Sequence, residues 1–308
     1  MVSTAAERWA KARTFHHSLY PATRIAAERK QSVSVCLPAR ECAETVGEIV
    51  SVLAGLRERG AIDQLLVVDA ASEDGTAEIA ERAGASVVQE RELLPGTGGV
   101  LGKGDAMWRA LSVLSGELVV FLDADSEGFC EHFATGLLGP LVCEQDVQFV
   151  KAFYRRPFEQ GGISLPDGGG RVNHLMARPA LSLFYPELAT VRQPLAGEVA
   201  ARRELLERLP FATGYGVEIA MLIDIWHAVG LNGMAQVDLD LHRNRHQPLL
   251  ALTEMSETVL ATIAGRLVAE GRLSMDGIGG LSGGGPAGGA GSVQAPIERP
   301  PLASVIAP

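Results

Sequence analysis

The feature that most constrains the fold is an apolar run closed by two acidic residues, LVVFLDADS (118–126). An apolar run of this length predicts a buried strand that ends at a loop. Because side chains alternate along a strand, Asp123 and Asp125 lie on the same side of the chain. Two converging carboxylates repel each other unless a cation relieves them, and oxygen ligands suit Mg²⁺ or Mn²⁺, which also bind the diphosphate of a nucleotide. The alternative interpretation is a solvated turn, since Asp-x-Asp occurs often by chance.

From Ser32 to about Arg156, predicted strands and helices alternate in the pattern of a parallel sheet with crossover helices. The chain is therefore predicted to be an α/β protein. The predicted strands are 32–37, 64–69, 86–89, 118–122 and 148–154, and the predicted helices between them are 43–59, 76–83 and 105–114. Beyond Gly161 the order is less regular, with helices predicted at 178–184, 202–208 and 216–229.

Two further predicted strands end in polar clusters. The segment PARE (38–41) follows the first strand, and the second strand ends at Asp69, which opens the segment DAASEDGT. In an open α/β sheet, ligands bind outside the carboxyl ends of the strands, so three polar strand ends indicate one crevice. Ser72 and Asp74 also suit a plain helix cap, whereas Asp69 is placed to accept hydrogen bonds from a base or a ribose. The sequence has neither GxGxxG after its first strand nor GxxxxGKS, which argues against a dinucleotide fold and a P-loop kinase.

A glycine-rich segment, PGTGGVLGKGD (95–105), precedes a predicted helix. Lys103 lies between two glycines and can approach a phosphate without steric hindrance, close to the helix N-terminus. The alternative is a flexible surface loop, which composition alone favours. The segment therefore predicts a phosphate contact only in combination with the polar strand ends.

Composition narrows the function classes. The net charge of −10 argues against a general nucleic-acid binder. No apolar stretch approaches the ~20 residues that span a bilayer, so no membrane partner is expected. The N-terminus lacks the apolar core of a signal peptide, and the cysteines at positions 36, 42, 130 and 143 show no CxxC spacing. Free thiols in apolar surroundings are typical of a cytoplasmic protein.

Several segments together resemble known enzymes. LPARE (37–41), DAASEDGT (69–76), GKG (102–104) and DAD (123–125) resemble the GT-A glycosyltransferases, which use nucleotide sugars. KAFYRRP (151–157), GGGRVN (168–173), QPLAGE (193–198) and FATGYGVEI (211–219) are similar to a narrower group. That group is the retaining glucosyl-3-phosphoglycerate synthases and the closely related mannosyl-3-phosphoglycerate synthases. The resemblance covers roughly 32–255 and implies a GT-A (Rossmann-like) fold, a mainly parallel central sheet with helices on both faces.

The resemblance also implies roles for individual residues. Lys103 contacts the nucleotide-sugar phosphates, Asp125 binds the metal, and Asp123 lies nearer the ribose and the sugar. Glu218 lies close to the transferred hexose, so these four are the expected catalytic residues. The other donor-binding residues implied are Leu37, Pro38, Ala39, Glu41, Asp69 and Ser72. The acceptor site implied is Gly170, Arg171, Asn173 and Asn244, where the planar fork of arginine suits the carboxylate and phosphate of 3-phosphoglycerate.

The third metal ligand has two alignments with the family. Matching the segment HRNR (242–245) directly makes His242 the metal ligand and Asn244 an acceptor contact. Counting back from Pro248 shifts the frame by two residues and assigns these roles to Asn244 and His246. His242 is favoured slightly, and His246 stays open.

The activity implied is glucosyl transfer from a nucleotide sugar, UDP-glucose being favoured, to the 2-hydroxyl of D-3-phosphoglycerate with retention of configuration. GDP-mannose as donor, or dual donor specificity, is the alternative. More distant alternatives are a nucleotidyltransferase and a non-catalytic sugar-nucleotide sensor. The expected cofactor is Mg²⁺ or Mn²⁺, and the family resemblance implies a homodimer.

The expected organisation has four parts. Residues 1–30 form a helical N-terminal extension, 31–160 the nucleotide-sugar-binding α/β half, and 161–275 the acceptor-binding half of the same GT-A domain. Residues 276–308 are rich in Gly, Pro, Ala and Ser and are predicted to be a flexible tail.

Overall fold

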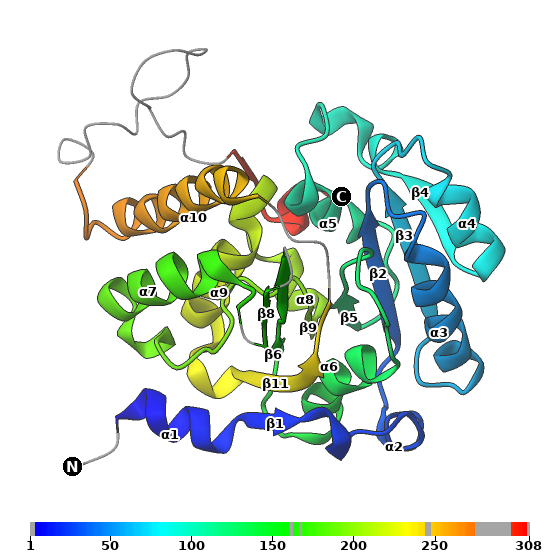
Figure 1. The fold of residues 1–308 in the computed structure, drawn as a ribbon, viewed down its shortest axis with the longest axis horizontal. Coiled ribbons are helices and arrows are strands. Elements are labelled where there is room, and N and C mark those ends of the chain that lie inside the picture. Colours follow the sequence, from blue (N-terminus) through cyan, green and yellow to red (C-terminus); the bar gives the residue numbers. More distant parts are fainter. Residues whose placement is uncertain (1–3, 161–162, 167, 244–247, 275–296, 307–308) are drawn as a thin grey trace.

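A computed structural model describes residues 4–160, 163–166, 168–243, 248–274 and 297–306. At its centre lies an eight-stranded sheet in the order β1-β11-β6-β9-β5-β2-β3-β4 (Figure 1). Its strands are β1 (Thr14–His16), β2 (Val33–Ala39), β3 (Gln64–Asp69), β4 (Ser86–Gln89), β5 (Leu118–Phe121), β6 (Phe149–Arg155), β9 (Val199–Arg202) and β11 (Met234–Leu241). Only β9 runs antiparallel to its neighbours in this sheet, β5 and β6. The prediction of a mainly parallel central sheet is therefore confirmed.

Helices cover both faces of the sheet, as the sequence predicts. On one face pack α2 (Ala22–Glu28), α3 (Val46–Glu58), α4 (Thr76–Ala83) and α6 (His132–Cys143). On the other pack α1 (Ala5–Ala12), α5 (Lys103–Ala110), α7 (Arg178–Phe184), α8 (Arg203–Glu207), α9 (Val217–Val229) and α10 (Leu249–Ala269). Within the described ranges, no helix combines the length and the apolarity that a membrane span requires.

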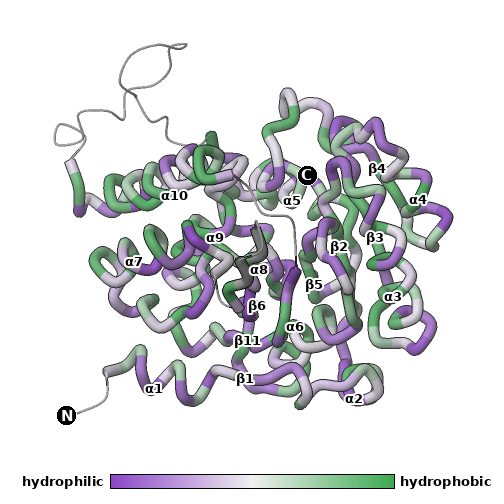
Figure 2. The backbone as a smooth tube through the Cα atoms, in the orientation of Figure 1, coloured by the Kyte–Doolittle hydropathy of each residue, from purple (hydrophilic) through white to green (hydrophobic). Residues whose placement is uncertain are grey.

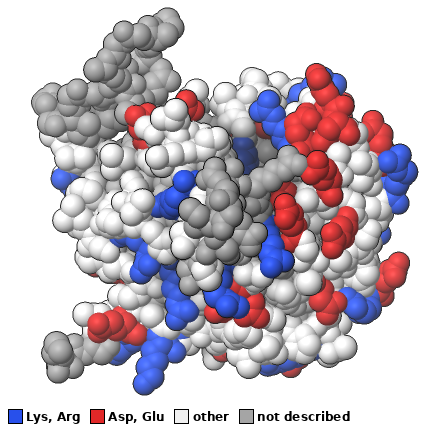
Figure 3. All heavy atoms as spheres, in the orientation of Figure 1, with Lys and Arg blue, Asp and Glu red and all other residues white. Residues whose placement is uncertain are grey.

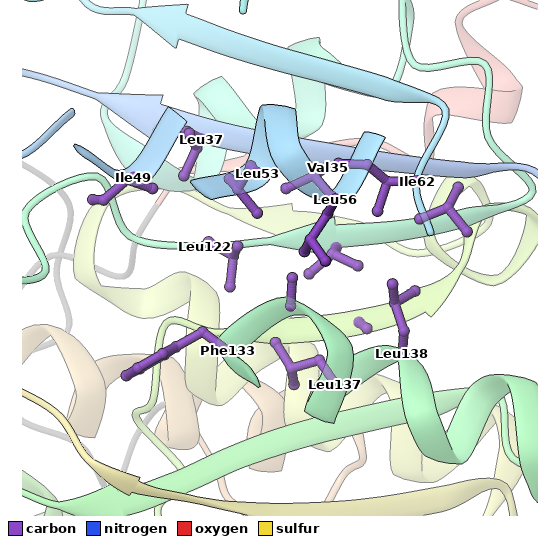
Figure 4. Packing of buried hydrophobic residues seen from close by; sticks show 14 of the residues in the cluster. Val35, Leu37, Ile49, Leu53, Leu56, Ile62, Leu122, Phe133, Leu137 and Leu138 are labelled. Atoms are coloured by element: carbon purple, nitrogen blue, oxygen red, sulfur yellow. The ribbon is translucent and has the colours of Figure 1, made fainter. Parts of the chain in front are cut away.

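The two faces form two hydrophobic cores because strand side chains alternate. In β5, Leu118 and Val120 join the α3–α6 core, whereas Val119 and Phe121 join the α5–α9 core. Figure 4 shows Val35 and Leu37 of β2 beside Leu53 and Leu56 of α3, with Leu137 of α6 on the opposite side of the same cluster. Figure 2 shows the same pattern along the whole backbone, with apolar segments running through the sheet and polar ones on the outer turns. Strands buried on both faces are mostly apolar, as in β5 (LVVF) and residues 65–68 of β3, whereas β2 also contains the buried Ser34.

The N-terminal 30 residues are more than the predicted helical extension. Between α1 and α2, β1 pairs in parallel with β11 and forms one edge of the central sheet. Trp9 of α1 is buried, and its indole Nε1 donates to the Met234 carbonyl at 2.9 Å. The segment is therefore an integral part of the domain.

The prediction of a flexible tail is wrong for residues 297–306. β12 (Glu298–Arg299) pairs antiparallel with β10 (Phe211–Ala212), and Leu302 is fully buried. A sequence poor in apolar residues docks here through backbone pairing, the buried Leu302 side chain and Arg299, which is described below. Residues 276–296 of the predicted tail lie outside the described residues.

Seven parallel strands end at one edge of the sheet, at His16, Ala39, Asp69, Gln89, Phe121, Arg155 and Leu241. β9 runs the other way, so its first residue, Val199, lies at this edge as well. The topology therefore gathers the polar segments that follow these strands around one crevice.

Candidate active site

A cavity of about 810 Å³ opens at this edge, within the range of sites that bind nucleotide-sized ligands. The first half of the chain contributes lining residues that end or follow β2, β3 and β5 or start α5, including Pro38, Ala39, Arg40, Ala70, Lys103, Asp123 and Asp125. The second half contributes Tyr154, Arg156, Gly170, Arg171, Asn173, Gly197 and Glu218. Residues that the sequence assigns to donor and acceptor binding thus face one cavity.

Lys103 is held between two carboxylates. Its Nζ lies 2.5 Å from Asp123 Oδ1 and 3.0 Å from Glu218 Oε1. Burial alone would lower the pKa of Lys103, but the charges of Asp123 and Glu218 outweigh burial and raise the pKa above its ordinary value. Lys103 is therefore a permanent cation in the wall of the cavity.

Gly197 allows this ion pair to form. A Cβ at position 197 would collide with the Lys103 ammonium and with both carboxylate oxygens of Asp123. Position 197 in the QPLAGE segment is a glycine because its backbone packs directly against the Lys103–Asp123 pair. No turn is the reason for it.

Asp125 is exposed to the cavity, two residues beyond Asp123. Enclosure by the cavity walls and the neighbouring charge of Asp123 raise the pKa of Asp125, while Lys103 opposes the rise. A carboxylate in this state is stabilised by an added cation.

Near Asp125 lies a buried cluster that consists of His242, Glu198, Tyr154 and Ser126. Nε2 of His242 lies 3.0 Å from Glu198 Oε1 and 2.9 Å from Ser126 Oγ, and its ring stacks on Tyr154 with centroids 4.4 Å apart. The Tyr154 hydroxyl donates to Glu198 Oε2 at 2.7 Å. Burial would raise the pKa of Glu198, but His242 and Tyr154 outweigh burial and hold that pKa below its usual range.

The contacts of this buried cluster use Nε2 of His242 and leave Nδ1 available to bind a metal. With Nε2 engaged by Glu198 and Ser126, Nδ1 is buried and has no hydrogen-bond partner among the described residues. A histidine whose second nitrogen is held by a carboxylate is the usual arrangement around a protein metal ion. The orphaned Nδ1 and the enclosed Asp125 carboxylate therefore fit a divalent cation. His246 and Asn244 lie outside the described residues.

The residues expected to hold the nucleoside form a bonded cluster beside the cavity. The Glu41 amide donates to Ser72 Oγ at 2.9 Å, and the Ser72 amide donates to Asp69 Oδ2 at 3.1 Å. Asp69 is buried, and its Oδ1 has no hydrogen-bond partner within the described part of the chain. Leu37, by contrast, is fully buried in the core. In this structure Leu37 packs in the core, and its contact with the donor stays a prediction.

The expected acceptor residues lie along the second half of the cavity. Arg171 stacks over Phe158, with its Cζ 5.0 Å from the ring centroid. Asn173 is buried and braces the segment before Gly197, because its Oδ1 accepts from the Leu195 amide at 3.4 Å. Arg156, which the sequence analysis did not single out, adds a second guanidinium to this wall.

Figure 3 shows Lys and Arg over the half with α7 and β11, and Asp and Glu mainly over β4 and its neighbours.

The sequence analysis also missed Glu198 and Lys151 as site residues, although both lie in quoted segments. Lys151 is buried, and its Nζ donates to the Ala196 carbonyl at 2.7 Å. Burial lowers the pKa of Lys151 to about 8 despite the nearby Glu218 and Glu198. The detectable signal is a charged residue inside an otherwise apolar strand, since such a residue needs a partner.

Lys151 gives a testable dependence of stability on pH. Its folded-state pKa of about 8 lies below the ordinary 10.5, so between these values the unfolded chain binds the extra proton. The free energy of unfolding should therefore rise with pH in that window, by about 2 kcal/mol between pH 8 and 9.5. Urea unfolding of the wild type and of Lys151→Met at both pH values measures the difference. An equal pH response in the two proteins would refute the shift.

Comparisons with known proteins identify the family of this chain. The sequence model of glycosyl transferase family 2 matches residues 34–134. A glucosyl-3-phosphoglycerate synthase of Petrotoga mobilis is 42% identical over 270 residues, 86% of this chain and 83% of the relative. That of Mycolicibacterium smegmatis is 44% identical over 241 residues, 78% and 79% of the two chains.

Solved structures extend the match to the fold. The mannosyl-3-phosphoglycerate synthase of Rubrobacter xylanophilus superposes with a TM-score of 0.88 at 44% identity, covering 99% of this chain and 100% of the other. The glucosyl-3-phosphoglycerate synthase of Mycobacterium tuberculosis, solved with Mn²⁺, UDP-glucose and phosphoglyceric acid, gives 0.81 at 37% identity over 95% and 98%. The GT-A fold expected from the sequence is confirmed. With identity above 40% over most of both chains, this protein belongs to the glucosyl-3-phosphoglycerate synthase family.

Proposed function

We propose that this protein transfers glucose from UDP-glucose to the 2-hydroxyl of D-3-phosphoglycerate, as a metal-dependent retaining hexosyltransferase. The observation that carries the proposal is a single cavity that joins the Lys103–Asp123–Glu218 cluster to a wall with two arginines. A diphosphate sugar and an anionic acceptor both need positive charge. On the donor side Lys103 and a divalent cation on Asp125 would supply it, and on the acceptor side Arg156 and Arg171 would. The relatives named above support the substrate pair.

On the donor side, Lys103 would pair with the diphosphate and release its hold on Asp123, which then faces the ribose and the sugar. Asp125 and His242 would hold Mn²⁺ or Mg²⁺, which neutralises charge on the departing diphosphate when bound. Glu198 and Ser126, both within 3.0 Å of Nε2, fix the orientation of the His242 ring. Buried and stacked on Tyr154, this ring has little freedom to turn.

On the acceptor side, Arg171 and Arg156 would bind the carboxylate and phosphate of 3-phosphoglycerate, because a guanidinium pairs with such groups through two hydrogen bonds. The acceptor 2-hydroxyl then forms its bond to the anomeric carbon from the face that the diphosphate leaves. The bond from that carbon to the phosphate oxygen breaks, and the same oxygen takes the hydroxyl proton. Glu218, held by Lys103, would position the hexose.

A second donor is favoured by one observation, the close superposition on the mannosyl enzyme of Rubrobacter xylanophilus. Purified protein with Mn²⁺ should release UDP from UDP-glucose only when 3-phosphoglycerate is present, and the same assay with GDP-mannose measures the second activity. A higher kcat/KM with GDP-mannose would reverse the donor assignment. Release of pyrophosphate from a nucleoside triphosphate would instead favour a nucleotidyltransferase, and tight donor binding without turnover would favour a sensor.

We propose that the protein is cytoplasmic and forms a homodimer, and sedimentation velocity tests the oligomeric state. Support comes from large leucines that are more than two-thirds exposed on neighbouring elements, with 79% exposure at Leu175, 73% at Leu183, 69% at Leu249 and 84% at Leu250. Apolar side chains clustered in this way on the surface are typical of an interface. Leu183→Glu should shift the protein toward the monomer if α7 lies in that interface.

Arg171→Ala should separate acceptor from donor binding. Loss of a charge-assisted contact should weaken 3-phosphoglycerate binding by ~2–3 kcal/mol, while donor affinity stays nearly unchanged. Calorimetric titration of both ligands into wild type and variant measures this, and Arg178→Ala, an exposed arginine of α7, is the matched control. Equal losses for both ligands, or none, would contradict the assignment.

A further inference from the structure

The end of the chain reaches the loops of the active site. We call residues 297–306 the C-terminal segment; Figure 1 shows it beside α5. Through β12 it pairs with β10, and the Ile297 carbonyl accepts from the Thr213 amide at 3.0 Å and from its hydroxyl at 2.9 Å. Thr213 directly precedes Gly214 and Tyr215, which line the cavity, and Glu218 follows within one helical turn. The segment therefore holds one side of the catalytic cluster.

Arg299 extends this hold to the other side. Its guanidinium pairs with the fully buried Asp105, at 2.6 Å from Oδ1 and 3.0 Å from Oδ2. It also donates to the carbonyls of Thr97 at 2.6 Å and Gly99 at 2.7 Å. Asp105 lies two residues after Lys103, in the first turn of α5.

The glycine-rich loop before Lys103 depends on such contacts for its shape. A Cβ added at Gly96, Gly98 or Gly99 would meet nothing within 4 Å, so side-chain packing does not confine these positions. Hydrogen bonds do. Arg109 donates to the carbonyls of Gly98 at 2.7 Å and Leu94 at 3.2 Å, and Asp105 Oδ2 accepts from the Leu101 amide at 2.9 Å.

We propose that Arg299 is a positioning residue for the transfer reaction. It holds the 97–101 loop and the start of α5 against the 213–218 turn, and thereby sets the 3.0 Å contact between Lys103 and Glu218 in the donor site. The C-terminal segment is a clamp across both walls of the donor-phosphate site. This inference rests on the proposed function, because it assigns the clamp to donor binding.

A purely structural role is the competing explanation, since removing one partner of a buried ion pair generally destabilises a protein. The two roles predict different kinetics. A structural loss lowers the melting temperature and the fraction of active enzyme without changing KM. Loss of the clamp changes the affinity of the folded enzyme for the donor and leaves the acceptor wall untouched.

The test compares Arg299→Met and Arg299→Lys with Glu298→Gln, in the full-length protein. Glu298 is the neighbouring residue of β12, and its carboxylate pairs with Arg266 of α10. We expect Arg299→Met to raise the KM for UDP-glucose at least tenfold and lower kcat, with 3-phosphoglycerate affinity within twofold of wild type. Arg299→Lys should recover most of the melting temperature but not the donor KM, because one ammonium cannot bind Asp105 and two carbonyls together. Glu298→Gln should leave the donor KM unchanged.

Hydrogen–deuterium exchange without ligands gives a readout that is independent of activity. Amides 97–104 should exchange faster in Arg299→Met than in wild type or in Glu298→Gln. If the wild type is inactive with UDP-glucose and with GDP-mannose, the proposed function is refuted. The clamp still stands if amides 97–104 exchange faster in Arg299→Met than in the wild type. An unchanged donor KM in Arg299→Lys, or unchanged exchange of the loop in a folded Arg299→Met, would overturn the clamp. If Arg299→Met does not fold, the Lys variant and Asp105→Asn decide by the same two readouts.

Discussion

Replacing Asp125 by Asn should reduce turnover by roughly a thousandfold or more while the protein stays folded, because the variant loses the charge that binds the metal. Asp125 is exposed to the cavity and adds little to the core. Its pKa is raised by enclosure and by Asp123, so its charge is unfavourable in the metal-free protein. The melting temperature of metal-free Asp125→Asn should therefore equal or exceed that of the wild type.

Metal titration separates this result from simple damage. Mn²⁺ added with UDP should raise the melting temperature of the wild type and leave that of Asp125→Asn unchanged. EDTA should silence the wild type, and Mg²⁺ or Mn²⁺ should restore it. Glu58→Gln, at an exposed position of α3, is the control and should behave like the wild type. Full activity in excess chelator would show that the reaction needs no metal.

Replacing Lys103 by Met should lower kcat/KM for the donor at least a hundredfold. The ammonium lies between Asp123 and Glu218, and its removal leaves two unpaired carboxylates where the diphosphate must bind. Like charges in an enclosed site repel strongly. The loss should therefore appear in donor binding and in turnover, whereas 3-phosphoglycerate affinity should change little. Steady-state kinetics with each substrate varied in turn measures the split.

Gly197→Ala offers an independent way to disturb the same pair. The added methyl would push Lys103 away from Asp123 without removing any charge, so it should also raise the donor KM. Lys11→Met, an exposed lysine of α1, is the control for loss of a lysine elsewhere. A donor KM within threefold of wild type in Lys103→Met would show that Lys103 does not contact the phosphates.

Parts of the fold were predictable because local chemistry determined them. The bounds of β3 and β4 and of α4 and α7 match the predicted ranges, since each is an apolar or amphipathic run between clear turn or capping signals. α6 was missed because it is buried almost all round and contains Gly136, Gly139 and Pro140, which hide the helical period. Gly139 is required there by packing, because a Cβ would collide with the Tyr20 ring. β9 and α10 were missed as well.

Part of the candidate site was predictable from short segments whose residue types indicate their chemistry. These segments contain the acidic strand end, the lysine between glycines and the arginine after GGG. The family resemblance and the strand–helix alternation led from those segments to the GT-A fold. The buried cluster around His242 could not be predicted from short segments in this way. His242 and Glu198 are 44 residues apart in number, and only the register of β6, β9 and β11 brings them within 3.0 Å.

The sequence by itself determined the alternation of elements, the polar strand ends and the charged groups available for chemistry, because these depend on residues close together in the chain. Tertiary structure alone decided which distant residues complete them. Arg299 reads as part of a featureless tail until β12 pairs with β10 and carries its guanidinium to Asp105, 194 positions earlier. Local propensity carries no information about such a contact, because it joins two opposite charges that meet only after the chain has folded.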